Sequence, residues 1–161
     1  MTKPINAAEL INRMRNERLN QIDLALGRKL RVLFVCGGNT CRSPMAAAIS
    51  NFLHAELLEA ESAGTAAWEP AANKKAVDVM CELFSVDIST HKPRRLSDLN
   101  LQAYDIVVAL DHAVATELRD ADLWGIVEEW DVRDPYGHPT SEYEATALAL
   151  RDRINELVHG L

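Results

Sequence analysis

Two short apolar runs constrain the fold of this chain more than any other feature. They are RVLFV at residues 31–35 and DIVVAL at residues 105–110. Nearly continuous apolar runs of this length are typical of parallel strands that are buried on both faces of a sheet. We therefore expect a sheet with helices on both faces.

Weaker strand signals and helical segments alternate with these two runs. ESAGT at 61–65 and IVEEW at 126–130 are short strand candidates, and the second is typical of an edge strand. Helices are expected over residues 45–60, 72–85, 113–119 and 142–158. Alternation with short connections predicts an α/β fold, a single doubly wound domain with a four-stranded parallel sheet.

The first part of the chain stands apart from this pattern. Residues 5–26 contain no proline and place Ile11, Met14 and Ile22 near one helical face, which Arg18 interrupts. We expect an N-terminal helical extension over residues 1–29, packed on the outside of a domain that spans residues 30–161. A helix that binds a partner or a second copy of the chain is the alternative.

Charge and cysteine content exclude several classes of protein. The net charge is −7, with +4 in residues 1–31 and −11 in residues 32–161, and such an acidic body argues against nucleic-acid binding. No apolar run is long enough for membrane insertion and no secretory signal begins the chain, so we expect a cytoplasmic protein. Three cysteines without a zinc-site spacing predict neither a disulfide framework nor a metal, and no cofactor is expected.

The loop VCGGNTCRSP at residues 35–44 joins the first strand to the helix that follows. In such folds this loop presents backbone N–H groups and a helix N-terminus to an anion. Gly37 and Gly38 permit a tight curl that turns the N–H groups inward, and Arg42 can hold two oxygens of a tetrahedral oxyanion. These groups favour the nucleophilic thiolate of Cys36 at the base of the loop, and Ser43 can donate a hydrogen bond to it.

A general acid is expected in another loop at the same edge of the sheet. Attack of sulfur on phosphorus expels a leaving group that needs a proton, and Asp134 in RDPYG follows the last strand. Taken alone, DPYG is a common turn, and a single cysteine after a strand is usually a buried small hydrophobe. The combination favours catalysis at phosphorus over both of these alternatives.

These residues identify a resemblance to a known family. VLFVCGGNTCRSPMA at 32–46 resembles the signature of the low-molecular-weight protein tyrosine phosphatases, and SAGT, HKPRRL, YDIVVALD and DPYG follow in that family's order, over about residues 31–160. The resemblance implies hydrolysis of phosphotyrosine in proteins through a phosphocysteine at Cys36. It also implies Arg42 as phosphate clamp, Ser43 as donor to the thiolate, and Asp134 as the acid that later activates water.

Further roles follow from the same resemblance. Asn39 and His91 match residues that hold the loop in shape, and Cys41 matches a cysteine that forms a reversible disulfide with the nucleophile. Trp68 and Tyr136 match positions that flank the substrate entrance, although Trp68 could simply cover the core. The phosphate-binding and supporting residues are Gly37, Gly38, Asn39, Thr40, Cys41, Ser43 and His91. Cys81 is expected in the core.

Three alternatives to a tyrosine phosphatase remain. The first is a protein arginine phosphatase. Most tyrosine-specific members carry a bulky aliphatic residue at the position of Thr40, whereas protein arginine phosphatases carry threonine there; Tyr136, in contrast, favours phosphotyrosine. Arsenate reductases share the loop but need cysteines just after the third strand, where this chain has Asp111 and no cysteine beyond Cys81. A noncatalytic phosphate-binding module is disfavoured because nucleophile, clamp and acid are all present.

Overall fold

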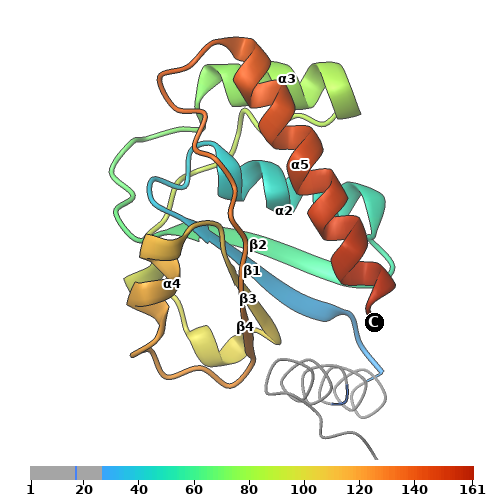
Figure 1. Cartoon of the computed structure of the whole chain (residues 1–161), viewed down its shortest axis with the longest axis vertical. Coiled ribbons are helices and arrows are strands. Elements are labelled where there is room, and N and C mark those ends of the chain that lie inside the picture. Colours follow the sequence, from blue (N-terminus) through green and yellow to red (C-terminus); the bar gives the residue numbers. More distant parts are fainter. Residues whose placement is uncertain (1–16, 18–26) are drawn as a thin grey trace, which may run out of the picture.

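The structure, a computed structural model, describes Glu17 and residues 27–161. Four parallel strands form one sheet in the order β2-β1-β3-β4, with β1 at Leu30–Cys36, β2 at Leu58–Gly64, β3 at Ile106–Ala109 and β4 at Ile126–Glu129 (Figure 1). The predicted four-stranded parallel sheet is confirmed, with β4 at an edge. Apart from Glu17, the helix predicted over residues 5–26 lies outside the described residues, and the division of the chain at residue 30 stays a prediction.

Helices cover both faces of the sheet, as the sequence predicts. They are α2 at Arg42–Leu53, α3 at Lys74–Phe84, α4 at His112–Leu118 and α5 at Thr140–His159, and Figure 1 shows α4 apart from the other three. Val32 and Phe34 of β1 belong to the core on the side of α2, α3 and α5, whereas Leu33 and Val35 belong to the core on the side of α4. Alternate side chains of a strand point to opposite faces, so both faces of β1 are buried.

The helix predicted over residues 45–60 is wrong in its second half. α2 ends at Leu53, and the segment from Leu58 pairs with β1 instead. The side chain of Asn51 fixes the reversal, because it donates to Ala60 O (2.9 Å) and accepts from Ala60 N (2.8 Å). Strand pairing outweighs the helical propensity of this segment, since it buries one face of β2 on the core.

The position of Cys81 also differs from its prediction. Cys81 lies on α3 and is exposed, whereas the buried residues of this helix are Ala76, Val79 and Met80. Adjacent helical residues point about 100° apart, so the residue after Met80 turns away from the core. The preference of free cysteine for the interior does not decide its position here.

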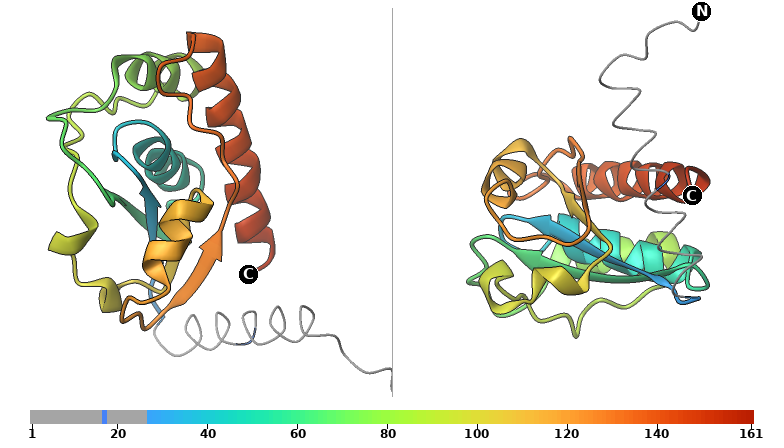
Figure 2. Two further views of the ribbon diagram at one scale, coloured as in Figure 1. Left: turned by 60° about the vertical axis from the view of Figure 1, so that its left-hand side comes forward. Right: turned by 90° about the horizontal axis from the view of Figure 1, so that it is seen from below.

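The strand order places the loop after β1 where ligands bind in open α/β sheets. The chain runs from β1 to β2 on one side and later to β3 on the other side of β1, so the order reverses between β1 and β3. Such a reversal leaves a crevice beyond the carboxyl ends of the strands. Figure 2 shows the loop after β1 and the segment before α5 at this end of the sheet, away from the C-terminus. No helix in the described part of the chain is long and apolar enough to cross a membrane.

Candidate active site

The loop that joins β1 to α2 is held from outside by its carbonyl groups. Four of these carbonyls accept hydrogen bonds from surrounding segments: Cys36 O from Thr65 N (3.0 Å), Gly37 O from Ala66 N (2.9 Å), Asn39 O from His91 Nε2 (2.8 Å) and Thr40 O from Asn73 N (2.9 Å). The donors come from three separate parts of the chain. The surrounding structure therefore fixes the course of the loop at nearly every peptide.

The N–H groups of the same loop remain available for a ligand. Among the described residues, the N–H groups of residues 37–41 find no hydrogen-bond acceptor. Asn39 takes a left-handed conformation (φ 56°), and alternation of right- and left-handed residues turns successive N–H groups to one side. The concave N–H face that the sequence predicts thus lies next to Cys36, with the N-terminus of α2 behind it.

A line of hydrogen bonds connects this loop to the sulfur of Cys36. Arg94 N donates to Asn39 Oδ1 (3.0 Å), and Asn39 Nδ2 donates to Ser43 Oγ (2.8 Å). The Ser43 hydroxyl lies 2.9 Å from Cys36 Sγ and 3.4 Å from Ala63 O, and because a thiolate can only accept, Ser43 donates to the sulfur when Cys36 is ionised. Ser43 is thereby oriented as a donor to the thiolate form of Cys36.

His91 supports the loop as a neutral side chain. Burial lowers the pKa of His91 and the positive charge of Arg94 lowers it further, while the hydrogen bond to Asn39 O acts in the opposite direction. A carbonyl oxygen can only accept, so Nε2 carries the proton and donates. This contact supports the Asn39 peptide from the side opposite to the N–H groups.

Gly64 at the end of β2 lies in direct contact with the loop. A Cβ atom at this position would lie 2.6 Å from Gly37 O and 3.0 Å from both Asn39 N and Asn39 Cβ. The approach leaves no room for any side chain, so the glycine is required by packing rather than by its backbone conformation. The SAGT segment therefore acts as a support for the loop.

Arg42 is buried and its guanidinium is held at one edge. Nη1 donates to Asp111 Oδ2 and to Val132 O, both at 3.0 Å, with Leu110 O at 3.4 Å. Nη2 lies 3.7 Å from Asp134 Oδ2. Within the described chain, Nε and Nη2 make no hydrogen bond to protein, so this edge of the guanidinium can hold two oxygens of one anion.

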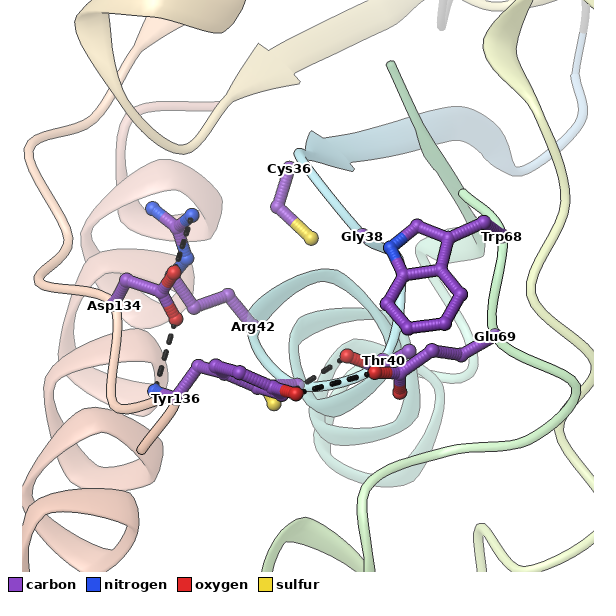
Figure 3. Close-up of a pocket in the computed structure, with 9 residues that line it drawn as sticks. Cys36, Gly38, Thr40, Arg42, Trp68, Glu69, Asp134 and Tyr136 are labelled. Carbon is purple, nitrogen blue, oxygen red and sulfur yellow. Dashed lines mark hydrogen bonds and ion pairs between the residues drawn. The ribbon is translucent and has the colours of Figure 1, made fainter. Parts of the chain in front are cut away.

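A pocket of about 200 Å³ opens above Cys36 (Figure 3). Its lining comprises Cys36, Gly38, Thr40, Cys41, Arg42, Trp68, Glu69, Asp134 and Tyr136. Trp68 is 78% exposed and Tyr136 is 54% exposed, so both aromatic side chains stand at the mouth, and Trp68 does not cover the core. Asp134 accepts a hydrogen bond from Tyr136 N (3.1 Å), which directs its other oxygen to Arg42.

Cys41 lies in the pocket wall as a protonated thiol. Burial raises the pKa of Cys41, whereas contacts with Thr40 Oγ1 (3.6 Å) and the Tyr143 hydroxyl (3.8 Å) act against this rise. Cys36, Cys41 and Cys81 are all free thiols. The part of the chain that the structure describes contains no cluster of three or more His, Cys, Asp or Glu side chains that could hold a metal ion.

Three residues of the site did not emerge from the sequence. Arg94 contributes its backbone N–H, which any residue but proline could supply, so no sequence signal marks it. Asp111 forms an ion pair with Arg42 and caps α4 by accepting a hydrogen bond from Val114 N (2.9 Å). An aspartate between a predicted strand and a predicted helix is a sequence signal for such a helix cap, and it could have identified Asp111. Glu69 follows Trp68 at the pocket mouth, with no pattern that distinguishes it from other surface glutamates.

Comparisons with known proteins agree with this geometry. The family model for low molecular weight phosphotyrosine protein phosphatases matches residues 31–161. The crystal structure of a low molecular weight protein tyrosine phosphatase from T. tengcongensis is 36% identical, has a TM-score of 0.75 and covers 83% of this chain and all of that one. A protein-arginine-phosphatase of Geobacillus stearothermophilus is 29% identical over 81% of this chain and 95% of its own length. Arsenate reductase 2 of Staphylococcus epidermidis is 30% identical over 82% of this chain and 95% of its own length.

Proposed function

Because the chain belongs to the low molecular weight phosphotyrosine protein phosphatase family, we propose that it removes phosphate from phosphotyrosine side chains of proteins through a phosphocysteine at Cys36. The observation that carries this proposal is the loop of residues 37–41. Within the described part of the chain, the carbonyls of Gly37, Asn39, Thr40 and Cys41 accept hydrogen bonds, while the N–H groups of the loop stay unpaired beside the buried Cys36. A noncatalytic anion site needs no thiol at this point.

The first chemical step transfers the phosphoryl group to sulfur. The inward N–H groups and the Nε and Nη2 edge of Arg42 bind the phosphate oxygens, so phosphorus lies above Cys36 Sγ. The sulfur lone pair forms the S–P bond while the P–O bond to the phenol breaks. Asp134 gives its proton to the departing phenolate oxygen, since it lines the same pocket as Cys36 and its side chain is 55% exposed.

The second step returns the enzyme to its starting state. Asp134, now a carboxylate, accepts a proton from a water molecule whose oxygen attacks phosphorus. The S–P bond breaks and leaves the thiolate of Cys36, which the hydrogen bond from Ser43 stabilises, and inorganic phosphate departs. Asp111 contributes by fixing Nη1 of Arg42, so the guanidinium keeps its orientation through both steps.

The pocket mouth supports an aromatic substrate. Trp68 and Tyr136 come from the loops after β2 and β4 and stand on two sides of the opening, and a flat phenol ring fits between aromatic faces. These features favour phosphotyrosine as the substrate.

Phosphoarginine is the second candidate, and Thr40 is the observation that favours it. The Thr40 side chain lines the pocket wall, where a hydroxyl group offers a polar partner to guanidinium N–H groups. Replacement by isoleucine adds a methylene group and deletes the hydroxyl. Arsenate reduction is disfavoured because the chain has only three cysteines and Cys81 lies exposed on α3, outside the pocket.

The cellular setting follows from the chemistry. A nucleophilic thiol that must stay reduced favours a reducing compartment, which supports a cytoplasmic location. The partner is a phosphorylated protein. Association through the N-terminal segment is a separate proposal, to be tested by the mass of the full chain in solution.

The experiment that tests the substrate is a comparison of kcat/KM for phosphotyrosine, phosphoarginine and phosphoserine peptides, with arsenate reduction measured alongside. We expect phosphotyrosine to be hydrolysed fastest and arsenate not to be reduced. Thr40→Ile should lower phosphoarginine turnover by about tenfold to a hundredfold and leave phosphotyrosine turnover equal or higher. Thr40→Val, which replaces the hydroxyl with a methyl group of similar size, is the matched control. Faster hydrolysis of phosphoarginine in the unmodified enzyme would replace the first candidate by the second.

A further inference from the structure

The mouth of the pocket carries a carboxylate that the reaction does not use. Glu69 lines the opening next to Trp68, and the Tyr136 hydroxyl donates to its Oε1 at 3.3 Å (Figure 3). Glu69 and Tyr136 belong to loops that follow different strands, so the hydrogen bond between them spans the opening. It holds the carboxylate of Glu69 at the rim.

The charge of Glu69 is not neutralised by a neighbouring cation. Among the described residues Glu69 takes part in no ion pair within 4.0 Å. Arg95 contacts the same loop but donates its Nε–H to Ala67 O (3.3 Å). The other carboxylate of the pocket, Asp134, lies 3.7 Å from Arg42, so among the described residues Glu69 is the carboxylate of the lining that has no cation within 4.0 Å.

The charge of Glu69 also acts on the Tyr136 hydroxyl at the mouth. The negative charge of Glu69, together with the hydrogen bond to it, raises the pKa of Tyr136. Tyr136 therefore stays protonated at neutral pH and remains a donor. The carboxylate of Glu69 keeps its remaining lone pairs available for a group on the substrate.

We propose that Glu69 selects phosphotyrosine sites that have a basic residue beside the phosphotyrosine and discriminates against sites with acidic neighbours. This inference rests on the proposed function. When the phosphate is bound at the loop, the phenol ring fills the space between Trp68 and Tyr136. The peptide backbone then lies at the rim, where flanking side chains come within reach of Glu69.

The magnitude follows from Coulomb interactions at a partly solvated site. A single exposed charge pair changes affinity modestly, and a change from lysine to glutamate converts attraction into repulsion. We expect a peptide with lysine on both sides of phosphotyrosine to have about threefold to tenfold higher kcat/KM than one with glutamate. Salt should reduce this ratio, because the interacting groups are reached by solvent.

The test compares these two peptides in the full chain. Glu69→Gln should bring the ratio of the two kcat/KM values close to one, and Glu69→Lys should invert it. The matched control is Glu59→Gln, which removes the same charge from an exposed position near the start of β2, at the other end of the sheet. This control should keep the original ratio, because it changes the net charge of the protein by the same amount but at a position outside the pocket lining.

The outcomes separate this inference from the proposed function. Rapid hydrolysis of both phosphotyrosine peptides at equal rates would overturn the role of Glu69 alone. So would a ratio that survives Glu69→Gln, since the preference would then arise from the overall negative charge. Failure to hydrolyse either peptide while phosphoarginine is hydrolysed would overturn both proposals.

Discussion

Replacement of Gly64 by alanine should damage the active site without touching a catalytic group. The new Cβ atom would lie 2.6 Å from Gly37 O, whereas ordinary contacts begin at 3.4 Å. Strand and loop must separate by about 0.8 Å to relieve this overlap. The loop cannot yield freely, because Ala66 N and Thr65 N hold the carbonyls of Gly37 and Cys36.

The expected loss has two parts. Forcing an extra carbon into a packed contact costs about 1 to 3 kcal/mol in the free energy of unfolding. Displacement of the phosphate-binding N–H groups by close to 1 Å should reduce kcat/KM by about a hundredfold, since catalysis depends on the placement of phosphorus over sulfur. Both parts originate from one contact at the carboxyl end of β2.

Two other glycines supply controls for this experiment. Gly160→Ala meets nothing closer than 3.5 Å and should change neither stability nor activity. Gly125→Ala would collide with the backbone oxygens of Tyr104 and Asp105, far along the chain from the loop, and should lower stability. At a temperature where it remains folded, Gly125→Ala should keep its kcat/KM, so that loss of stability and loss of the site can be told apart.

The assay is urea denaturation together with kcat/KM for an aryl phosphate. Wild-type kcat/KM in a folded Gly64→Ala protein would refute the reasoning, because it would mean that the loop does not depend on the contact with β2. An equal loss of activity in Gly125→Ala would attribute the effect to general destabilisation.

Three further predictions follow from the site. Asp134→Asn should slow aryl phosphates with poor leaving groups by about a hundredfold or more and activated ones far less, and equal slowing across a leaving-group series would deny its role as general acid. Because burial lowers the pKa of His91, the folded state binds its proton less readily than the unfolded state, so stability should fall as pH drops below about 6.5. The urea midpoint of unfolding should therefore decrease between about pH 7.5 and about pH 5.5, and His91→Asn should make this decrease smaller. A decrease of the same size in His91→Asn would exclude His91 as its origin. Peroxide should inactivate the enzyme reversibly through a Cys36–Cys41 disulfide, and Cys41→Ser should make recovery with thiol less complete, with equal recovery as the contrary result.

The sequence was most informative where one residue type suits only one kind of chemistry. Cys36, Arg42 and Ser43 lie in one loop, and Asp134 follows the last strand, so a parallel sheet had to bring them to one edge. The structure indeed places all four around the pocket or directly beneath it. The two buried strands were equally clear, because nearly continuous apolar runs of this length are typical of parallel strands buried on both faces.

Prediction failed where tertiary contacts decide between local alternatives. The segment after Leu53 has good helical propensity, yet it pairs with β1 through contacts that only the assembled sheet offers. Cys81 is exposed because of its angular position on α3, which a single residue type does not report. Arg94 supports the site through its peptide N–H and Glu69 through its place at the rim, and neither function leaves a mark in the residue pattern.

The most direct test of the mechanism is to identify the atom that receives the phosphoryl group. Asp134→Asn protein, rapidly quenched during turnover of an activated aryl phosphate whose leaving group needs little help from the acid, should carry one phosphoryl group on the proteolytic fragment that contains Cys36. Mass spectrometry should find none on the protein with the additional substitution Cys36→Ser, although that protein should still bind phosphate analogues through the loop and Arg42. A phosphoryl group on another residue, or turnover that survives Cys36→Ser, would contradict the mechanism.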